Sequence, residues 1–297
     1  MTTQGSIRAR VDVAAAGGAA PDGFAEVVCG IDGRRLGFEA ARQAARLASP
    51  SGRLTLVAVV EPFAALSGRW GDEPSRWRVE LKRERSPETC VAELSGRASV
   101  SLAWAEAQAG GPAELQSRVV EGEVWDGLLG AVRSEGADLV AVGAHGGSRL
   151  VGAALADAAA IVLHDAPCSV LVARHGYDPA RFPARIVVGV DGSEESVAAL
   201  AAASALALRS GGELVVITAG HDQEAAVAAV GRFDAPHLHI ATPSKPVEAL
   251  VTAARSADLA VVGSRGLHGA AALGSVSERV AFRAESSVLV VRPAAAA

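Results

Sequence analysis

Short apolar runs, rich in Val, Leu and Ile, alternate along the chain with longer Ala-rich stretches. An apolar run of this length is typical of a strand buried on both faces of a parallel sheet, and its alternation with helical stretches indicates βαβ units. The expected strands are residues 26–31, 53–60, 115–120, 138–143, 168–174, 185–190, 213–218, 237–241, 258–263 and 287–292. Helices are expected between them, for example from Phe38 and from Ser196. The pattern therefore predicts an α/β protein.

The second of these helices has recognisable signals at both ends. Ser193 stands where an N-cap is expected, and Glu194 and Glu195 follow in the first turn, where negative charge complements the helix dipole. Gly211 and Gly212 then provide a C-terminal stop. The helix is therefore expected to begin directly after the first strand of the second half of the chain.

Three phrases from the first half of the chain return in the second half. The pairs are "EVVCGIDG" at 26–33 with "IVVGVDG" at 186–192, "DLVAVGAHG" at 138–146 with "DLAVVGSRG" at 258–266, and "SVLVAR" at 169–174 with "SVLVVR" at 287–292. Such internal repetition determines the architecture before any single motif is weighed. We expect two tandem five-stranded parallel-sheet domains with flanking helices.

The repeats also set the expected domain boundaries. Residues 1–22 are small, polar and rich in Gly and Ala, which predicts a flexible leader. The first domain, repeat one, spans 24–175 and has an enlarged middle at 61–112 with a dense run of charges. A linker with two prolines follows at 176–184, and the compact second domain, repeat two, spans 185–293. The charge run is typical of a solvated helix face or loop, and docking of a protein partner on this middle segment is left open.

Composition excludes several classes of function. The formal net charge is −5 and Lys and Arg are scattered, so nucleic acid is not an expected partner. The most apolar stretch, 151–173, is interrupted by charged residues and by Pro167, so no membrane span is expected. Cys29, Cys90 and Cys168 lie far apart and without metal-ligand spacing, which indicates buried thiols in a reducing compartment. A cytoplasmic protein is expected.

Glycines and polar residues follow the first and fourth strands of each repeat. They are Asp32, Gly33, Gly143, His145 and Gly146 in repeat one, and Asp191, Gly192, Gly263, Arg265 and Gly266 in repeat two. These strand ends meet at one crevice, where helix N-termini present free amides. Glycine lets backbone amides approach phosphate oxygens, whereas an ionised Asp suits a ribose or adenine donor, or a metal. In repeat two, Ser275 and Ser277 open the next helix and would add phosphate-binding hydroxyls.

With these motifs the chain resembles the universal stress protein family in its tandem two-domain form. The resemblance rests on "VGVDGS", "VVGSRG" and "GSVSE" and covers nearly the whole chain, about 24–175 and 184–293. It implies an adenine-nucleotide α-hydrolase-like fold and a stress-response or signalling module that binds ATP. The implied ATP contacts are Asp191, Gly192, Gly263, Arg265, Gly266, Gly274, Ser275 and Ser277 in repeat two, and Asp32, Gly33, Gly143, His145 and Gly146 in repeat one.

Neither repeat keeps the complete family pattern of Gly, two residues, Gly, nine residues and then Gly-Ser or Gly-Thr. Repeat one keeps the spacing but ends it in Ala156-Asp157, which places a carboxylate where phosphate would lie. Repeat two has Gly274-Ser275, but after only the seven residues 267–273. Like charges repel strongly in a partly desolvated crevice, whereas a slightly shortened loop re-closes at modest cost. ATP is therefore expected in repeat two, and an empty site in one or both repeats is left open.

Two histidine-containing motifs have plain structural interpretations. His164-Asp165 lacks a placed nucleophile, so a helix-end pair without a catalytic role is expected. His237 and His239 alternate along a strand but lack an evident third metal ligand, so satisfied or exposed histidines are expected.

The loops after the first strands bear on the choice between binding and catalysis. They read "DGRR" at 32–35 and "DGSE" at 191–194, and so lack both the Ser-Gly-Gly-x-Asp loop of related nucleotide hydrolases and the G-x-G-x-x-G of dehydrogenases. Binding without turnover is expected, and the protein is not expected to be an enzyme. A ligand-free scaffold that acts through protein contacts is the alternative, and a nucleotide hydrolase is the least favoured reading.

The last strands of the repeats, "SVLVAR" and "SVLVVR", are expected to lie near each other. Each ends its repeat with an apolar strand whose free edge must be covered. In relatives of this family the same strands pair across a dimer, so the chain is expected to form an intrachain pseudo-dimer. Association of whole chains into a homo-oligomer is left open.

Overall fold

Every strand expected from the apolar pattern is present in the computed structural model, which describes residues 23–61, 87–110, 114–144, 158–174, 178, 181–221, 223–233, 235–264 and 275–292. The strands are β1 (Phe24–Gly30), β2 (Ala48–Val60), β3 (Glu114–Glu121), β4 (Leu139–Gly143), β5 (Ser169–Ala173), β6 (Arg185–Gly189), β7 (Glu213–Ala219), β8 (Leu238–Thr242), β9 (Leu259–Gly263) and β10 (Ser287–Val291). The helices are α1 (Arg35–Leu47), α3 (Pro87–Ala109), α4 (Val124–Glu135), α5 (Ala158–Asp165), α6 (Glu194–Ser210), α7 (Glu224–Gly231), α8 (Pro246–Ala254) and α9 (Val276–Arg283). The prediction of an α/β protein is confirmed.

The strands form one continuous sheet in the order β3-β2-β1-β4-β5-β10-β9-β6-β7-β8. Within each repeat all neighbouring strands are parallel, as predicted. The repeats meet at β5 and β10, which pair antiparallel with Leu289 opposite Leu171. The prediction that the two last strands lie together is therefore confirmed, and the two expected five-stranded sheets are halves of one ten-stranded sheet.

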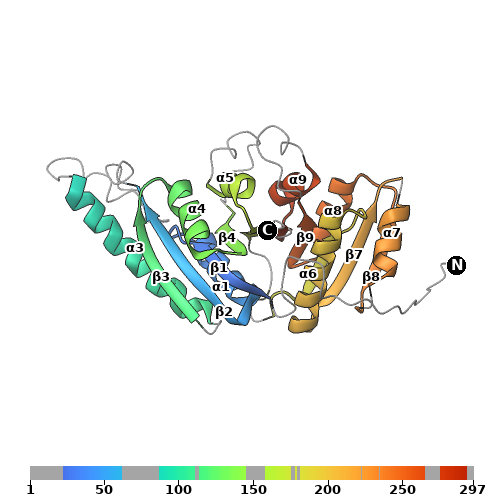
Figure 1. Cartoon of the computed structure of the whole chain (residues 1–297), viewed down its shortest axis with the longest axis horizontal. Coiled ribbons are helices and arrows are strands. Elements are labelled where there is room, and N and C mark those ends of the chain that lie inside the picture. Colours follow the sequence, from blue (N-terminus) through green and yellow to red (C-terminus); the bar gives the residue numbers. More distant parts are fainter. Residues whose placement is uncertain are drawn as a thin grey trace.

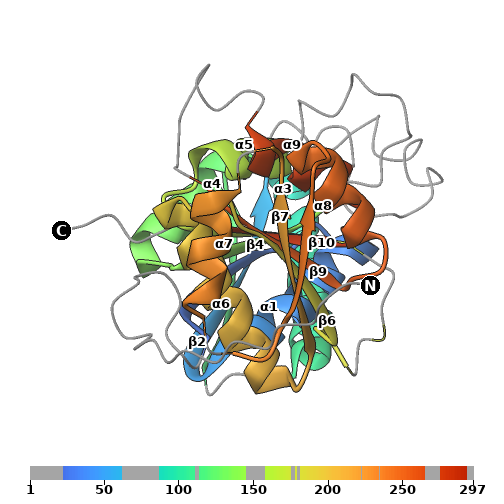
Figure 2. The ribbon, with the colours of Figure 1, turned by 90° about the vertical axis from the view of Figure 1, so that its right-hand side faces the viewer.

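Helices cover both faces of this sheet. On one face α1, α3, α6 and α7 contribute buried side chains such as Leu200, and on the other face α4, α5, α8 and α9 contribute side chains such as Val280. Successive strand residues serve opposite faces, as Val28 and Cys29 do in β1. Two-sided burial explains why the strands read as continuous apolar runs. Figures 1 and 2 both place α5 and α9 side by side near the top of the molecule, and in Figure 1 they lie midway along its long axis, where the repeats meet.

The Asp that opens each fourth-strand phrase ties that strand to the start of the first strand. The Asp138 carboxylate accepts a hydrogen bond of 2.8 Å from the Ala25 amide. The Asp258 carboxylate accepts bonds of 2.7 and 2.8 Å from the amides of Ala184 and Arg185. The repeated Asp-Leu phrase therefore has a structural role in the sheet.

Two of the three cysteines are buried thiols, as predicted. Burial raises the pKa of the Cys29 thiol far above its usual range and that of Cys168 to about 12, so neither is ionised at neutral pH. The side chain of Cys90 lies outside the described residues, as do the leader 1–22 and the charge run 69–85.

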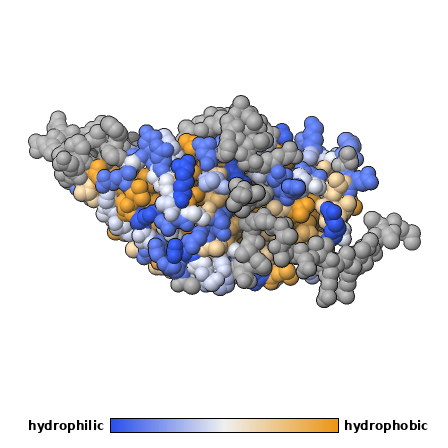
Figure 3. All heavy atoms as spheres, viewed as in Figure 1, coloured by the Kyte–Doolittle hydropathy of each residue, from blue (hydrophilic) through white to orange (hydrophobic). Residues whose placement is uncertain are grey.

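The enlarged middle of repeat one contains the helix α3. Its Trp104 ring lies 4.2 Å from the Phe38 ring of α1, measured between centroids, yet Trp104 and Val100 remain exposed. Figure 3 shows apolar residues scattered among hydrophilic ones on the face it displays. None of the helices in the described ranges is long and apolar enough to cross a membrane.

Candidate functional site

Both first strands end in a tight Asp-Gly turn that leads into a helix. Gly33 and Gly192 have φ of 72° and 88°, in the left-handed region that favours glycine. One carboxylate oxygen of Asp191 accepts hydrogen bonds from the Ser193 amide (3.0 Å) and the Ser193 hydroxyl (2.6 Å). The same hydroxyl accepts a bond from the Ser196 amide, so Ser193 caps α6 as predicted.

The fourth-strand glycines have a packing role that the sequence analysis missed. A Cβ on Gly263 would lie 2.3 Å from the Glu195 carbonyl oxygen in α6, and one on Gly143 would lie 2.5 Å from the Leu36 carbonyl carbon in α1. Real Cβ atoms do not come this close to backbone, so each glycine is needed for the first helix to cross the end of the fourth strand. Their presence is therefore explained without a ligand.

In repeat two the helix after the glycine loop opens with hydroxyls, as predicted. Ser275 is the N-cap of α9, and its hydroxyl accepts a hydrogen bond of 3.1 Å from the Glu278 amide. The Ser275 and Ser277 hydroxyl oxygens lie 3.2 Å apart. Free amides and the positive end of the helix dipole make such a position suitable for an anionic group.

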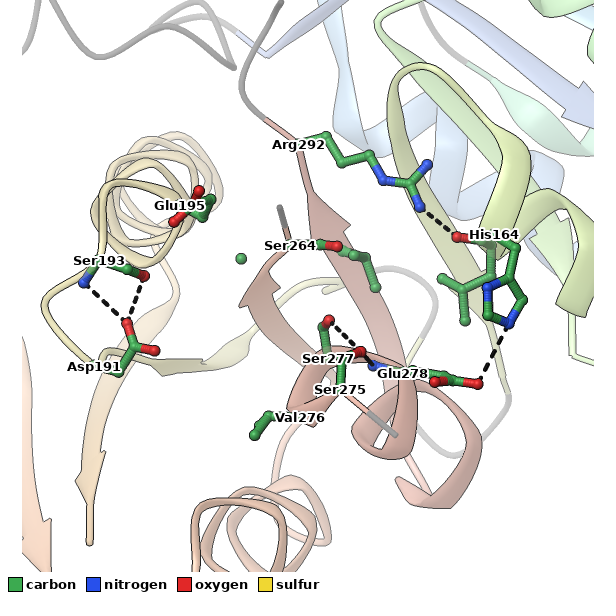
Figure 4. A pocket seen from close by; sticks show the side chains of 13 residues that line it. His164, Asp191, Ser193, Glu195, Ser264, Ser275, Val276, Ser277, Glu278 and Arg292 are labelled. Carbon is green, nitrogen blue, oxygen red and sulfur yellow. Dashed lines mark hydrogen bonds and ion pairs between the residues drawn. The ribbon is translucent and has the colours of Figure 1, made fainter. Parts of the chain in front are cut away.

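These residues converge on a cavity of about 230 Å³, which we call the repeat-two pocket (Figure 4). It is lined by Leu163, His164, Asp191, Ser193, Glu195, Gly263, Ser264, Ser275, Val276, Ser277, Glu278, Val290 and Arg292. The structure thus brings together Asp191, Gly263, Ser275 and Ser277 from the predicted set, with Gly192 in the adjoining turn. Arg265, Gly266 and Gly274 lie outside the described residues.

Part of the pocket wall comes from repeat one, which the sequence analysis did not foresee. Leu163 and His164 belong to the last turn of α5, and His164 Nε2 lies 3.3 Å from Glu278 Oε1 on α9. His164-Asp165 stands at a helix end, as predicted, but the imidazole faces the pocket. The pairing of the two last strands was the signal that could have placed α5 beside α9.

The corresponding strand ends of repeat one carry different side chains. Arg34 occupies the N-cap position that Ser193 holds in repeat two, and its Nε lies 4.0 Å from Asp32 Oδ2. The helix α5 opens with three alanines, where α9 has Val, Ser and Glu. Repeat one therefore lacks the helix-opening hydroxyls of repeat two. His145, Gly146 and Asp157 lie outside the described residues.

His239 in β8 and His237, which directly precedes that strand, each have a local hydrogen-bond partner. His237 Nδ1 lies 2.7 Å from the Ala235 carbonyl oxygen, and His239 Nε2 lies 3.1 Å from the Thr218 hydroxyl. Burial, with a smaller effect of His237, lowers the pKa of His239. Within the described ranges no three His, Cys, Asp or Glu side chains are grouped to hold a metal ion.

Comparison with known proteins gives one consistent result. The model of the universal stress protein family matches residues 23–174, 184–242 and 234–292. Two universal stress proteins of Mycobacterium tuberculosis are 28% and 30% identical to this chain; each alignment covers 90% of this chain, and 94% and 96% of the relative, respectively.

A solved structure shows the same fold over nearly the whole chain. A universal stress protein of Archaeoglobus fulgidus covers 90% of this chain and 96% of its own, with a TM-score of 0.69 at 19% identity. A universal stress protein solved in complex with cAMP is 36% identical over 37% of this chain and 98% of its own, with a TM-score of 0.31. Nucleotide binding is a property of that protein.

Proposed function

The chain belongs to the universal stress protein family, and from that premise we propose that it is a cytoplasmic stress-response or signalling module that binds an adenine nucleotide, ATP, in repeat two. The observation that carries the proposal is the convergence of Asp191, Ser275 and Ser277 on the repeat-two pocket. These three residues come from two different strand-to-helix connections, and they supply the two kinds of group that a nucleotide needs.

The two ends of a nucleotide call for different partners. The Ser275 and Ser277 hydroxyls, with the amides that begin α9, suit phosphate oxygens. The Asp191 carboxylate is an acceptor when ionised and suits a donor on the ribose or the adenine. Its fixed position, set by two hydrogen bonds from Ser193, favours one orientation of the ligand.

Repeat one is the weaker candidate for the same reasons. The alanines that open α5 offer no hydroxyl. Asp157, at the position matching Ser275, would repel a polyphosphate. We therefore propose one nucleotide per chain.

We propose binding without turnover. Asp191 Oδ1 already accepts two hydrogen bonds from Ser193, which makes this oxygen a poor general base. Purified protein incubated with excess ATP is expected to release no more phosphate than a buffer control. Sustained multiple-turnover hydrolysis that is lost on Asp191→Ala would contradict the proposal.

Calorimetric titration with ATP tests the location of the site. Ser277→Ala removes one hydroxyl from the pocket. A hydrogen bond to a charged group contributes about 1.5 kcal/mol, so its loss should weaken ATP binding about tenfold. Ser275→Ala and Gly266→Val are expected to weaken binding as well. Ser99→Ala is the matched control, since Ser99 lies on α3 in repeat one. This variant and Gly146→Val, also in repeat one, should bind ATP with an affinity within twofold of that of the wild-type chain.

Two results would contradict this assignment. Loss of binding in Gly146→Val with no change in Gly266→Val would place the ligand in repeat one. Absence of any nucleotide, both in the titration and in the mass spectrum of denatured purified protein, would favour the ligand-free scaffold.

A further inference from the structure

The helix α9, which presents Ser275 and Ser277 to the repeat-two pocket, is held at both ends by repeat one. Near its N-terminus, Glu278 Oε1 lies 3.3 Å from His164 Nε2 on α5. Near its C-terminus, the Arg174 guanidinium donates a hydrogen bond of 2.5 Å to the Ala281 carbonyl oxygen. Both contacts cross the boundary between the repeats.

The contact near the C-terminus of α9 consists of charge-assisted hydrogen bonds from Arg174. Arg174 follows β5 and also donates to the Ser286 carbonyl oxygen at 3.3 Å, while its amide donates to the Ser287 hydroxyl at 2.9 Å. Burial lowers the pKa of Arg174 to about 10, so the side chain remains a cation at neutral pH. A cation beside the last carbonyls of a helix complements the helix dipole.

The N-terminal contact is sheltered from solvent. The side chains of His164 and Glu278 are 20% and 11% exposed, so their interaction is screened less than that of a surface pair. Glu278 also donates its amide to the Ser275 hydroxyl, and that hydroxyl lies beside Ser277. A chain of contacts therefore runs from the imidazole of repeat one to the hydroxyls of repeat two (Figure 4).

The position of His164 is itself fixed by repeat two. Arg292, which follows β10 and is 8% exposed, donates hydrogen bonds to the carbonyl oxygens of Leu163 and Ala166 at the end of α5. Arg292 and Arg174 hold matching positions after the last strands of the two repeats. Each donates hydrogen bonds to the last helix of the other repeat: Arg292 to the end of α5, and Arg174 to α9. The last turn of α5 is thereby held where its imidazole meets Glu278.

We propose that the repeat-two pocket is a composite of both repeats, in which His164 of repeat one acts as a positioning residue that holds Glu278 and the N-terminus of α9 in the geometry that binds phosphate. The inference rests on the proposed nucleotide binding in repeat two. It gives repeat one, whose helix α5 opens with alanines in place of the α9 serine, a role at its neighbour's site.

Calorimetric titration of the 297-residue chain with ATP tests this role. His164→Ala should weaken ATP binding about three- to tenfold, which lies in the lower part of the range for coupled neighbours. Glu278→Gln should weaken binding similarly, and the double variant should lose no more than either single variant. His164→Lys places an ammonium donor opposite Glu278 and should restore most of the affinity. His221→Ala, which removes an exposed imidazole outside the pocket, is the matched control.

The outcomes separate this inference from the proposed function. Wild-type chain that binds no nucleotide overturns both. Wild-type binding together with His164→Ala affinity within twofold of it overturns the composite site alone. Loss of affinity in His164→Lys equal to that in His164→Ala, with all thermal midpoints unchanged, would also overturn positioning through the contact with Glu278.

Discussion

At the scale of single residues, the fourth-strand glycines are positions where a larger side chain does not fit. Gly263→Ala would place a Cβ 2.3 Å from the Glu195 carbonyl oxygen, so α6 must shift. We expect a loss of about 1–3 kcal/mol in the free energy of unfolding, measured by urea denaturation. The matched variant Gly130→Ala, mid-helix in α4 with nothing within 4 Å of the added Cβ, should instead stabilise by up to about 1 kcal/mol. Equal effects of the two variants would contradict this account.

Residue-level prediction from the sequence succeeded where the determinants are local. The Asp-Gly turns, the Ser193 cap and the serines that open α9 all follow from short-range backbone requirements. The sequence did not predict the packing role of Gly263 or the contact of His164 with Glu278, because each depends on a partner that only the tertiary fold brings close.

At the scale of elements, the two first helices differ in how their N-termini are capped. Ser193 caps α6 through the Ser196 amide, whereas Arg34 at the same position of α1 makes no cap hydrogen bond. Ser193→Ala should therefore cost about 1 kcal/mol of stability.

The reverse change in repeat one should stabilise the protein. Arg34→Ser gives α1 a cap, and the ion pair it removes, 39% and 42% exposed, contributes little. We expect a gain of about 0.5–1 kcal/mol by thermal or urea unfolding. A loss of stability in Arg34→Ser would show that the ion pair with Asp32 outweighs the missing cap.

Whole elements were predicted well because the strands are buried on both faces. Continuous apolar runs left little ambiguity about where the ten strands lie, and the expected boundaries agree with the observed ones within a few residues, apart from the longer start of β2. The order of the strands could not be obtained from periodicity, because pairing within a sheet joins segments far apart in sequence.

At the scale of the whole molecule, the repeats share one sheet, and an arginine of each donates hydrogen bonds to the other, so we expect the repeats to unfold together. Calorimetric and van't Hoff enthalpies should agree. Arg174→Ala leaves the Ala281 and Ser286 carbonyls without this donor and should cost about 1–3 kcal/mol. Arg255→Ala removes an ion pair with Glu285 whose two side chains are 64% and 71% exposed, so the free energy of unfolding should change little. Two separate transitions in the wild-type chain would contradict the shared core.

Nucleotide binding in repeat two is best tested by a crystal structure of the 297-residue chain grown with saturating ATP and Mg²⁺. The account predicts nucleotide density in the repeat-two pocket, with phosphate oxygens at the Ser275 and Ser277 hydroxyls and the nucleoside toward Asp191. It predicts no nucleotide in the crevice beside Asp32. Density beside Asp32 with an empty repeat-two pocket, or an empty pocket in both repeats, would contradict it.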